Sequence, residues 1–241
     1  MSNRYYDTSG QRAAKVQSLF GVIAPSYDLV NDLQSLGLHR YWKAKMISMA
    51  EPKEGEIALD VCCGTGDLAF ALIRRGVATA AVDFSLPMLA VGRQRSAKLP
   101  PKDAERLRWL CGDAQNLPFA DAQFDIVCVG YGLRNLVSWQ RGVEEMWRVT
   151  KPGGRLLILE FGKPANPFWR RLYEFYLKCG IPIFGRIFSG DAATYAYILE
   201  SLKEYPDQSV VMKKLQDLQG GNLRLVPFLG GVMTIHAATK S

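Results

Sequence analysis

The strongest constraint on the fold is a glycine-rich turn, Cys63-Gly64-Thr65-Gly66-Asp67, which follows the short apolar run 57–61 and precedes a helical pattern. Glycine lets the backbone turn sharply and lets a ligand approach it closely. A strand, a glycine turn and a helix in succession are therefore typical of sites for nucleotide-like ligands. We predict that Gly64, Thr65 and Gly66 bind a cofactor. The spacing also fits a relaxed dinucleotide fingerprint, so it does not identify that cofactor.

Two acidic residues beside the turn favour a cationic cofactor. Asp60 ends the run before the turn, and Asp67 opens the helix after it. A dinucleotide would place phosphates at this helix N-terminus, where the two carboxylates would repel them. S-adenosyl-L-methionine carries an ammonium and a sulfonium group and no phosphate. The sequence therefore predicts S-adenosyl-L-methionine as the cofactor, with Asp60 in its site, while helix capping remains an alternative role for Asp67.

Further candidate residues follow the next strands. Asp83 lies 17 positions after Gly66 (83 − 66), near the spacing of roughly 20 residues typical of an acid that binds ribose hydroxyls. Asp113 is expected to accept the adenine amino group, with Ala114 donating its backbone N–H, and Gly130 ends the fourth strand. The carboxyl ends of strands in an open α/β sheet meet at a ligand crevice. Turn formation is the alternative role for Asp83 and Asp113.

Short apolar runs alternate with helical patterns between residues 57 and 160, which predicts a parallel sheet covered on both faces. We expect one domain over residues 1–241, with a doubly wound, Rossmann-like α/β fold and a seven-stranded, mostly parallel sheet. Its expected parts are a helical N-terminal cap (1–50), a cofactor-binding core (51–163), a helical substrate-side insertion (164–218) and terminal strands in an antiparallel hairpin (219–241).

The bulk properties narrow the class of protein. The net charge of +7 favours contact with an anionic surface, either nucleic acid or lipid. The five cysteines show no C-x-x-C pairing, so we expect small buried side chains and no metal site. No secretory signal and no run of about 20 apolar residues is present, which predicts a cytoplasmic protein.

The chain resembles the ubiquinone/menaquinone biosynthesis C-methyltransferase family (UbiE/MenG type) over nearly its whole length. The run Gly132-Leu133-Arg134-Asn135 and the pattern Tyr27-Asp28-x-x-Asn31 are specific to that family. The other stretches that carry the resemblance are residues 16–43, 59–68, 82–89, 112–119, 124–136, 151–164 and 195–208. The likeness is greatest to the cyanobacterial and plastid 2-phytyl-1,4-naphthoquinone methyltransferases. One departure is Cys62, which stands where many methyltransferases have the first glycine of the loop.

The resemblance implies a class I methyltransferase fold and C-methylation of a prenylated 1,4-naphthoquinol, converting demethylphylloquinol to phylloquinol in phylloquinone biosynthesis. Arg134 is then expected to stabilise negative charge on a ring oxygen or to hold a water that takes the proton. Asn135 would bind a ring oxygen, and Tyr27 would come from helices that cover the site. His39 is expected to be a surface or capping histidine, and His236 is given no role.

Alternatives remain open at this stage. A demethylmenaquinone or ubiquinone-precursor methyltransferase is the nearest one, and a methyltransferase for another substrate or a non-catalytic ligand-binding protein are more distant. No basic patch with stacking aromatics accompanies the site, so we expect no nucleic-acid partner. Aromatic and basic residues mix over residues 168–188, which is compatible with peripheral membrane contact or with a lid helix. A homodimer is compatible with the sequence.

Overall fold

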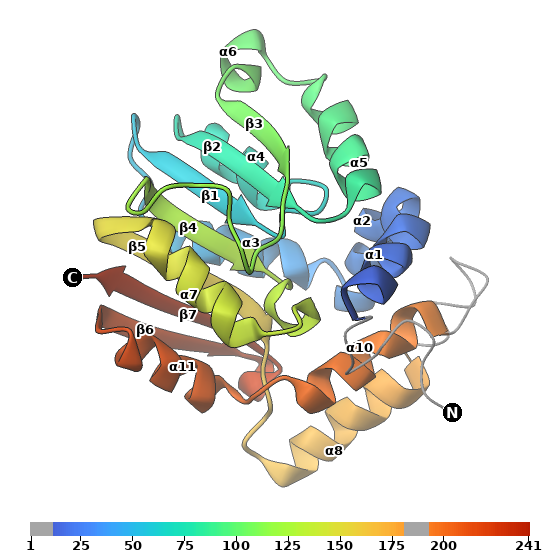
Figure 1. The fold of residues 1–241 in the computed structure, drawn as a ribbon. Coiled ribbons are helices and arrows are strands. Elements are labelled where there is room, and N and C mark those ends of the chain that lie inside the picture. Colours follow the sequence, from blue (N-terminus) through green and yellow to red (C-terminus); the bar gives the residue numbers. More distant parts are fainter. Residues whose placement is uncertain (1–11, 181–192) are drawn as a thin grey trace.

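The structure, a computed structural model, describes residues 12–180 and 193–241 and is built around a seven-stranded sheet (Figure 1). The strand order is β3-β2-β1-β4-β5-β7-β6. Strands β1 to β5 pair in parallel, whereas β7 pairs antiparallel with both β5 and β6. The strands are β1 (Ile57–Val61), β2 (Ala78–Asp83), β3 (Leu107–Cys111), β4 (Phe124–Gly130), β5 (Thr150–Phe161), β6 (Gly220–Phe228) and β7 (Met233–Lys240). The predicted mostly parallel sheet with an antiparallel C-terminal hairpin is confirmed.

Helices cover both faces of this sheet. The helices of the described residues are α1 (Arg12–Ile23), α2 (Tyr27–Ser35), α3 (Leu38–Met49), α4 (Asp67–Ile73), α5 (Leu86–Ser96), α6 (Pro101–Ala104), α7 (Trp139–Val149), α8 (Pro167–Phe175), α10 (Ala193–Glu204) and α11 (Gln208–Asp217). Short 3-10 turns occur at η1 (Ala24–Ser26), η2 (Leu133–Asn135) and η4 (Leu229–Gly231), and a π-helical turn, η3 (Tyr176–Gly180), continues α8. The alternation of strands and helices is that of a doubly wound fold.

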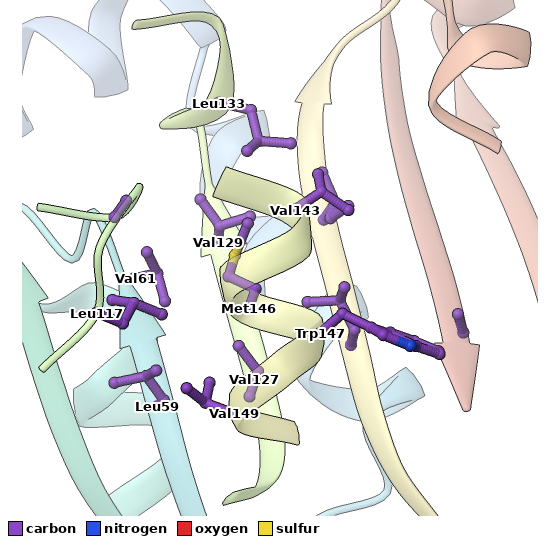
Figure 2. Packing of buried hydrophobic residues seen from close by; sticks show 14 of the residues in the cluster. Leu59, Val61, Leu117, Val127, Val129, Leu133, Val143, Met146, Trp147 and Val149 are labelled. Carbon is purple, nitrogen blue, oxygen red and sulfur yellow. The ribbon is translucent and has the colours of Figure 1, made fainter. Parts of the chain in front are cut away.

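Alternating side chains of the central strands explain why both faces need helices. Leu59, Val127 and Val129 point to one face and pack against Met146 of α7, as Figure 2 shows. Their neighbours along the strands point to the other face, where α3 and α4 cover them. Because most residues of β1 and β4 are buried on one face or the other, these strands read as nearly continuous apolar runs in the sequence.

The N-terminal helices α1 and α2 meet α10 beside the carboxyl ends of β1 and β2. Leu19 of α1 and Val30 of α2 form a buried cluster with Ile198 and Leu202 of α10. Figure 1 shows α1 and α2, in blue, and α8 and α10, in orange, along the same side of the sheet. The N-terminal cap and the helical insertion therefore pack on each other next to the predicted ligand crevice.

Two elements are interrupted, and one expectation about the cysteines is wrong. The N-terminal helical cap turns at Leu36 and Gly37, which both have positive φ. Residues 151–154 form a bulge inside β5, since the pairing with β4 jumps from Thr150 to Arg155. Cys111 and Cys179 are exposed rather than buried, although all five cysteines are free thiols.

Candidate active site

The glycine turn joins β1 to α4, and its two glycines have different roles. Gly64 has a φ of +56° and lines a cavity. Gly66 has a φ of +90°, and a Cβ at this position would lie 2.4 Å from the Trp109 ring. Both residues therefore sit in the left-handed region that favours glycine. Gly64 gives a ligand access to the backbone, whereas Gly66 lets the turn pack against β3.

Asp83, at the end of β2, holds the turn in place. Its Oδ2 atom accepts a hydrogen bond from the Gly64 N–H at 2.7 Å, and its Oδ1 atom accepts one from the Ser85 N–H at 2.8 Å. Burial raises the pKa of Asp83, and the backbone donors act against this rise. A carboxylate has about four acceptor sites, more than these backbone donors use, so the side chain can shape the turn and still accept a ligand hydroxyl.

Cavity 1 is the space at the carboxyl ends of β1 to β4, where the strand order reverses between β1 and β4. This is the position at which open α/β sheets bind ligands. Five of the predicted cofactor residues line it, namely Gly64, Asp83, Asp113, Ala114 and Gly130. Val16, Gln17 and Phe20 of α1 form part of the opposite wall. The hydroxyl of Ser85, also in the lining, is buried without a hydrogen-bond partner, as expected where a polar ligand completes the bonding. The lining fits a nucleoside cofactor.

The remaining predicted cofactor residues, Asp60, Thr65 and Gly66, lie outside this lining. Asp60 is buried beneath the turn, where its Oδ2 atom accepts the Ala69 N–H at 3.0 Å. Burial raises the pKa of Asp60 to about 8. Asp60 is thus placed to support the start of α4, and its charge depends on pH near neutrality.

The raised pKa of Asp60 predicts a pH-dependent stability. The folded-state pKa of about 8 exceeds the ordinary value of 3.8. Folded protein therefore keeps a proton that the unfolded chain loses, and stability falls as pH rises between these values. One such group contributes a slope of up to about 1.4 kcal/mol per pH unit. Asp60→Asn cannot titrate, so its stability relative to the wild type should rise from pH 6 to pH 8. Urea unfolding of both proteins without cofactor measures this, and a constant difference would contradict it.

Ion pairs that the sequence analysis missed surround the turn. Arg95 of α5 binds Asp28 Oδ2 at 2.9 Å and Asp67 Oδ1 at 2.7 Å, and Lys43 of α3 binds Asp67 Oδ2 at 2.7 Å. The Thr65 hydroxyl donates to Asp28 Oδ1 at 2.8 Å. Burial acts to raise the pKa of Asp67, but Lys43 and Arg95 outweigh this effect and hold the pKa well below its ordinary value. Asp67 therefore ties the N-terminal helices to the turn, and its charge is already compensated.

A second cavity, cavity 2, lies between the N-terminal helices, α8 and α10 and has a volume of about 280 Å³. Its lining is mainly aromatic and aliphatic, with Arg134 and His39 among the polar exceptions. Tyr27 and Tyr131 line both cavities and mark the place where they adjoin. Tyr131 has a φ of +62°, a costly backbone conformation for an aromatic residue that is concentrated at functional sites.

Arg134 is buried in an ion pair. It is 5% exposed, and its Nη1 atom lies 2.7 Å from Oε1 of Glu160, which is 0% exposed. Burial acts to lower the pKa of Arg134, but Glu160 outweighs this effect and raises it. The Nε atom of Arg134 is buried without a partner. The guanidinium is therefore a permanent cation with one donor unused, and sequence reasoning did not find Glu160.

Asn135 and Tyr27, the other predicted catalytic residues, also lie at the cavities. The Asn135 amide donates to the Tyr131 carbonyl at 3.2 Å, and its Oδ1 atom is buried without a partner. Asn135 lines cavity 1, whereas Arg134 lines cavity 2. Burial raises the pKa of Tyr27 well above its ordinary value, so its phenol stays protonated. The structure brings the three residues to the junction between the cavities.

Solved structures with a similar fold include S-adenosylmethionine-dependent methyltransferases. A putative S-adenosylmethionine-dependent methyltransferase from Methanococcus maripaludis aligns with a TM-score of 0.60 and 17% identity, covering 90% of this chain and 92% of that one. A methyltransferase of the same dependence from Aquifex aeolicus aligns with a TM-score of 0.55 and 18% identity, covering 81% and 88%. The fold is therefore that of the class I S-adenosylmethionine-dependent methyltransferases.

Sequence comparison narrows this class to one family. The model of the ubiE/COQ5 methyltransferase family matches residues 8–240, and the chain belongs to that family. It is 37% identical to the ubiquinone/menaquinone biosynthesis C-methyltransferase UbiE of Roseobacter denitrificans, covering 96% of this chain and 92% of the relative. It is 38% identical to the demethylmenaquinone methyltransferase of Paenarthrobacter aurescens, covering 95% and 88%. The protein is an S-adenosylmethionine-dependent C-methyltransferase.

The described residues contain neither a membrane-spanning helix nor a cluster of metal-binding side chains. Over residues 12–180 and 193–241, no helix combines the length and the hydropathy needed to span a membrane. In the same residues, no group of three or more His, Cys, Asp or Glu side chains could hold a metal ion. The segment 168–188, for which peripheral membrane contact and a lid helix are the alternatives, is only partly covered, since its residues from 181 onward lie outside the described ranges.

Proposed function

We propose that the enzyme methylates a ring carbon of a prenylated 1,4-naphthoquinol, converting demethylphylloquinol to phylloquinol in phylloquinone biosynthesis. The observation that carries this proposal is a pair of adjoining cavities that share Tyr27 and Tyr131. Cavity 1 lies at the crevice of the sheet and has polar residues in its lining, whereas the lining of cavity 2 is largely apolar. Demethylmenaquinol is the second candidate, favoured by the relative named demethylmenaquinone methyltransferase. Both acceptors share the naphthoquinol ring and differ in the prenyl tail.

Cavity 1 would hold the cofactor. Asp83 would accept the ribose hydroxyls, while Asp113 and Ala114 would bind the adenine edge from the loop after β3. Gly64 and Gly130 provide close approach at the ends of β1 and β4. When bound there, S-adenosylmethionine supplies a methyl group activated by the sulfonium charge. The chain's own contribution is to direct that methyl group toward Tyr27 and Tyr131 and to exclude water.

Cavity 2 would hold the acceptor ring and the start of its tail. Its volume of about 280 Å³ is close to the lower end of the roughly 300–1,000 Å³ typical of ligand pockets. Arg134 would stabilise negative charge developing on one ring oxygen through its unused Nε donor. Asn135 would hydrogen-bond a ring oxygen from the cavity 1 side, and Tyr27 would close the junction. Glu160 keeps the Arg134 side chain in place.

An exposed apolar rim at cavity 2 supports a route for a long prenyl tail. Leu36, Leu172 and Leu229 line the cavity and are 88%, 48% and 49% exposed. Phe168 and Phe175 extend this exposed surface along α8. Contiguous exposed apolar residues at a cavity mouth are typical of interaction sites. We therefore include peripheral contact with a lipid surface in the proposal, so that the tail can pass from bilayer to cavity.

Transfer of labelled methyl groups from S-adenosylmethionine to a panel of reduced acceptors tests the proposal. The panel contains 2-phytyl-1,4-naphthoquinol, demethylmenaquinols of two tail lengths and a prenylated benzoquinol, each presented in detergent and in vesicles. We expect the highest kcat/KM with the phytyl naphthoquinol. Higher kcat/KM with a demethylmenaquinol would favour the second candidate. Absence of transfer to every quinol, from protein that binds S-adenosylmethionine, would refute the proposed function.

A further inference from the structure

His39 is a polar residue of cavity 2 to which the proposed function gives no role. It lies on α3, is 4% exposed and lines cavity 2. Its Nδ1 atom is buried without a hydrogen-bond partner. The expectation of a surface or capping histidine is therefore wrong. His236, the other histidine, also has an Nδ1 atom without a hydrogen-bond partner, but it does not line this cavity. Of the two histidines, only His39 is therefore placed to contact a ligand in cavity 2.

Asp32 determines which nitrogen of His39 carries the proton. The His39 Nε2 atom lies 2.8 Å from Asp32 Oδ1, and Arg40 binds the same carboxylate through Nε and Nη2 at 2.5 and 2.6 Å. These bonds lower the pKa of Asp32, so the carboxylate is ionised and can only accept. Neutral His39 must therefore donate from Nε2. Its lone pair is left on Nδ1, the nitrogen without a protein partner.

The surroundings of His39 keep it neutral. Burial, followed by the charge of Lys43, lowers its pKa to about 4, and Arg40 acts in the same direction. Asp32 from α2 and Asp67 from α4 act against this lowering but are outweighed. The folded-state pKa lies below the ordinary value of 6.5. His39 is therefore in its basic form throughout the neutral range.

The other titratable groups of the described cavity lining are donors rather than bases. Arg134 has no acceptor atom, and its pKa is raised by Glu160 although burial acts to lower it. Burial raises the pKa of every tyrosine in the lining, so all of these phenols stay protonated. The tyrosines are Tyr27, Tyr131, Tyr173, Tyr176 and Tyr197. Among these described groups, His39 alone offers a lone pair for a proton at neutral pH.

The face of α3 that carries His39 also reaches the junction of the cavities, through Lys43. Lys43 is four residues further along α3 and therefore occupies the same helix face. The Lys43 Nζ atom lies 5.7 Å from the centroid of the Tyr131 ring, and Tyr131 lines both cavities. An acceptor ring in cavity 2 with its reacting carbon at Tyr131 would thus extend toward His39.

We propose that His39 is the general base of the methyl transfer, with Asp32 as its positioning residue; this rests on the proposed function. The ring carbon attacks the methyl carbon, a C–C bond forms, and the methyl–sulfur bond breaks with its electron pair remaining on sulfur. In the same step the His39 Nδ1 atom takes the proton of the conjugated ring hydroxyl, leaving a ring ketone. The ring carbon then loses its hydrogen to water as a proton, and His39 returns the first proton to the ring oxygen. The net release is one proton.

A weak base suffices for this step. While the ring carbon takes the methyl group, the hydroxyl becomes the O–H of a protonated ketone and is far more acidic than in the free quinol. Proton transfer concerted with carbon–carbon bond formation is therefore downhill even to an imidazole of low pKa. Arg134, on the same cavity, complements His39 because its positive charge disfavours the protonated ketone and so favours loss of that proton.

The test compares His39→Gln with the wild type and with His236→Gln as a matched control. Glutamine can keep a donor toward Asp32 but offers no basic nitrogen. We expect kcat to fall about 100-fold in His39→Gln, in line with general-base catalysis, with the Kd for S-adenosylmethionine unchanged by calorimetry. The control should keep the wild-type kcat. Asp32→Asn, which no longer fixes the tautomer, should lose kcat while keeping cofactor affinity.

A series of naphthoquinols with increasingly acidic ring hydroxyls separates catalysis from structure. The deficit of His39→Gln should shrink as hydroxyl acidity rises, because less help with the proton is needed. A deficit that is equal for all acceptors, or a wild-type kcat in His39→Gln, would overturn the assignment while leaving the proposed function intact. If His39→Gln does not fold, the same series is applied to Asp32→Asn with the same reading. Wild-type enzyme that methylates no quinol would refute the proposed function itself.

Discussion

Glu160→Ala is expected to lower the free energy of unfolding by about 3–5 kcal/mol. Glu160 is fully buried at the end of β5 and accepts bonds from the Arg134 guanidinium and from the Arg134 and Phe161 backbone N–H groups. Its removal leaves the Arg134 charge buried and uncompensated, since an arginine does not deprotonate in proteins. Turnover should fall as well, because Arg134 would lose the contact that fixes it at cavity 2.

Urea unfolding of Glu160→Ala against wild type measures this loss. The control is the double variant Glu160→Leu with Arg134→Met, which replaces the ion pair by apolar side chains and leaves no buried charge. Such replacements are often close to neutral, so the double variant should be more stable than Glu160→Ala. A single variant that loses less than about 1 kcal/mol would mean that the guanidinium reaches water when its partner is removed.

Asp83→Ala is expected to weaken S-adenosylmethionine binding by about 100-fold or more. The proposed contacts to the ribose hydroxyls are hydrogen bonds to a charged group, worth roughly 1.5–3 kcal/mol each. The substitution also frees the Gly64 N–H, which Asp83 Oδ2 holds at 2.7 Å. The variant would thus lose both the carboxylate that binds the ribose and the hydrogen bond that shapes the turn. Both losses would weaken cofactor binding.

Isothermal calorimetry with S-adenosylmethionine and S-adenosylhomocysteine gives the affinities of Asp83→Ala. Asp121→Ala is the matched control, because Asp121 is 77% exposed and precedes β4, at the opposite end of the sheet from the cavity. Its affinity should equal that of the wild type. If Asp83→Ala bound S-adenosylmethionine with wild-type affinity, other residues would bind the ribose, and Asp83 would only stabilise the turn.

The lining of cavity 1, the proposed cofactor site, was predictable because its determinants are local. A parallel sheet brings strand ends to one edge, so acids that follow successive strands meet there whatever the loops do. Asp83, Asp113 and Gly130 all line cavity 1 for this reason. Thr65 and Gly66 carried the same pattern but face the protein, since the Thr65 hydroxyl binds Asp28 and Gly66 packs on Trp109.

The acceptor side was less predictable because its contacts join elements far apart in the chain. Nothing near Arg134 in sequence indicates that Glu160 lies beside it, although its place at the end of the fifth strand was a usable signal. His39 reads as one polar residue on an amphipathic helix. Its burial depends on how α2, α3 and α8 enclose cavity 2, and helical periodicity does not specify that arrangement.

The two cavities have walls of different origin. Cavity 1 is built mainly from the loops that end the sheet strands, whereas cavity 2 is enclosed by the N-terminal helices, α8, α10 and the turn before β7. Substitutions in the enclosing helices can therefore reshape the proposed acceptor space without disturbing the strand ends that we propose hold the methyl donor. We therefore expect differences in the acceptor's ring or tail among relatives to be matched by substitutions in α1 to α3, α8, α10 and η4 at the residues that line cavity 2.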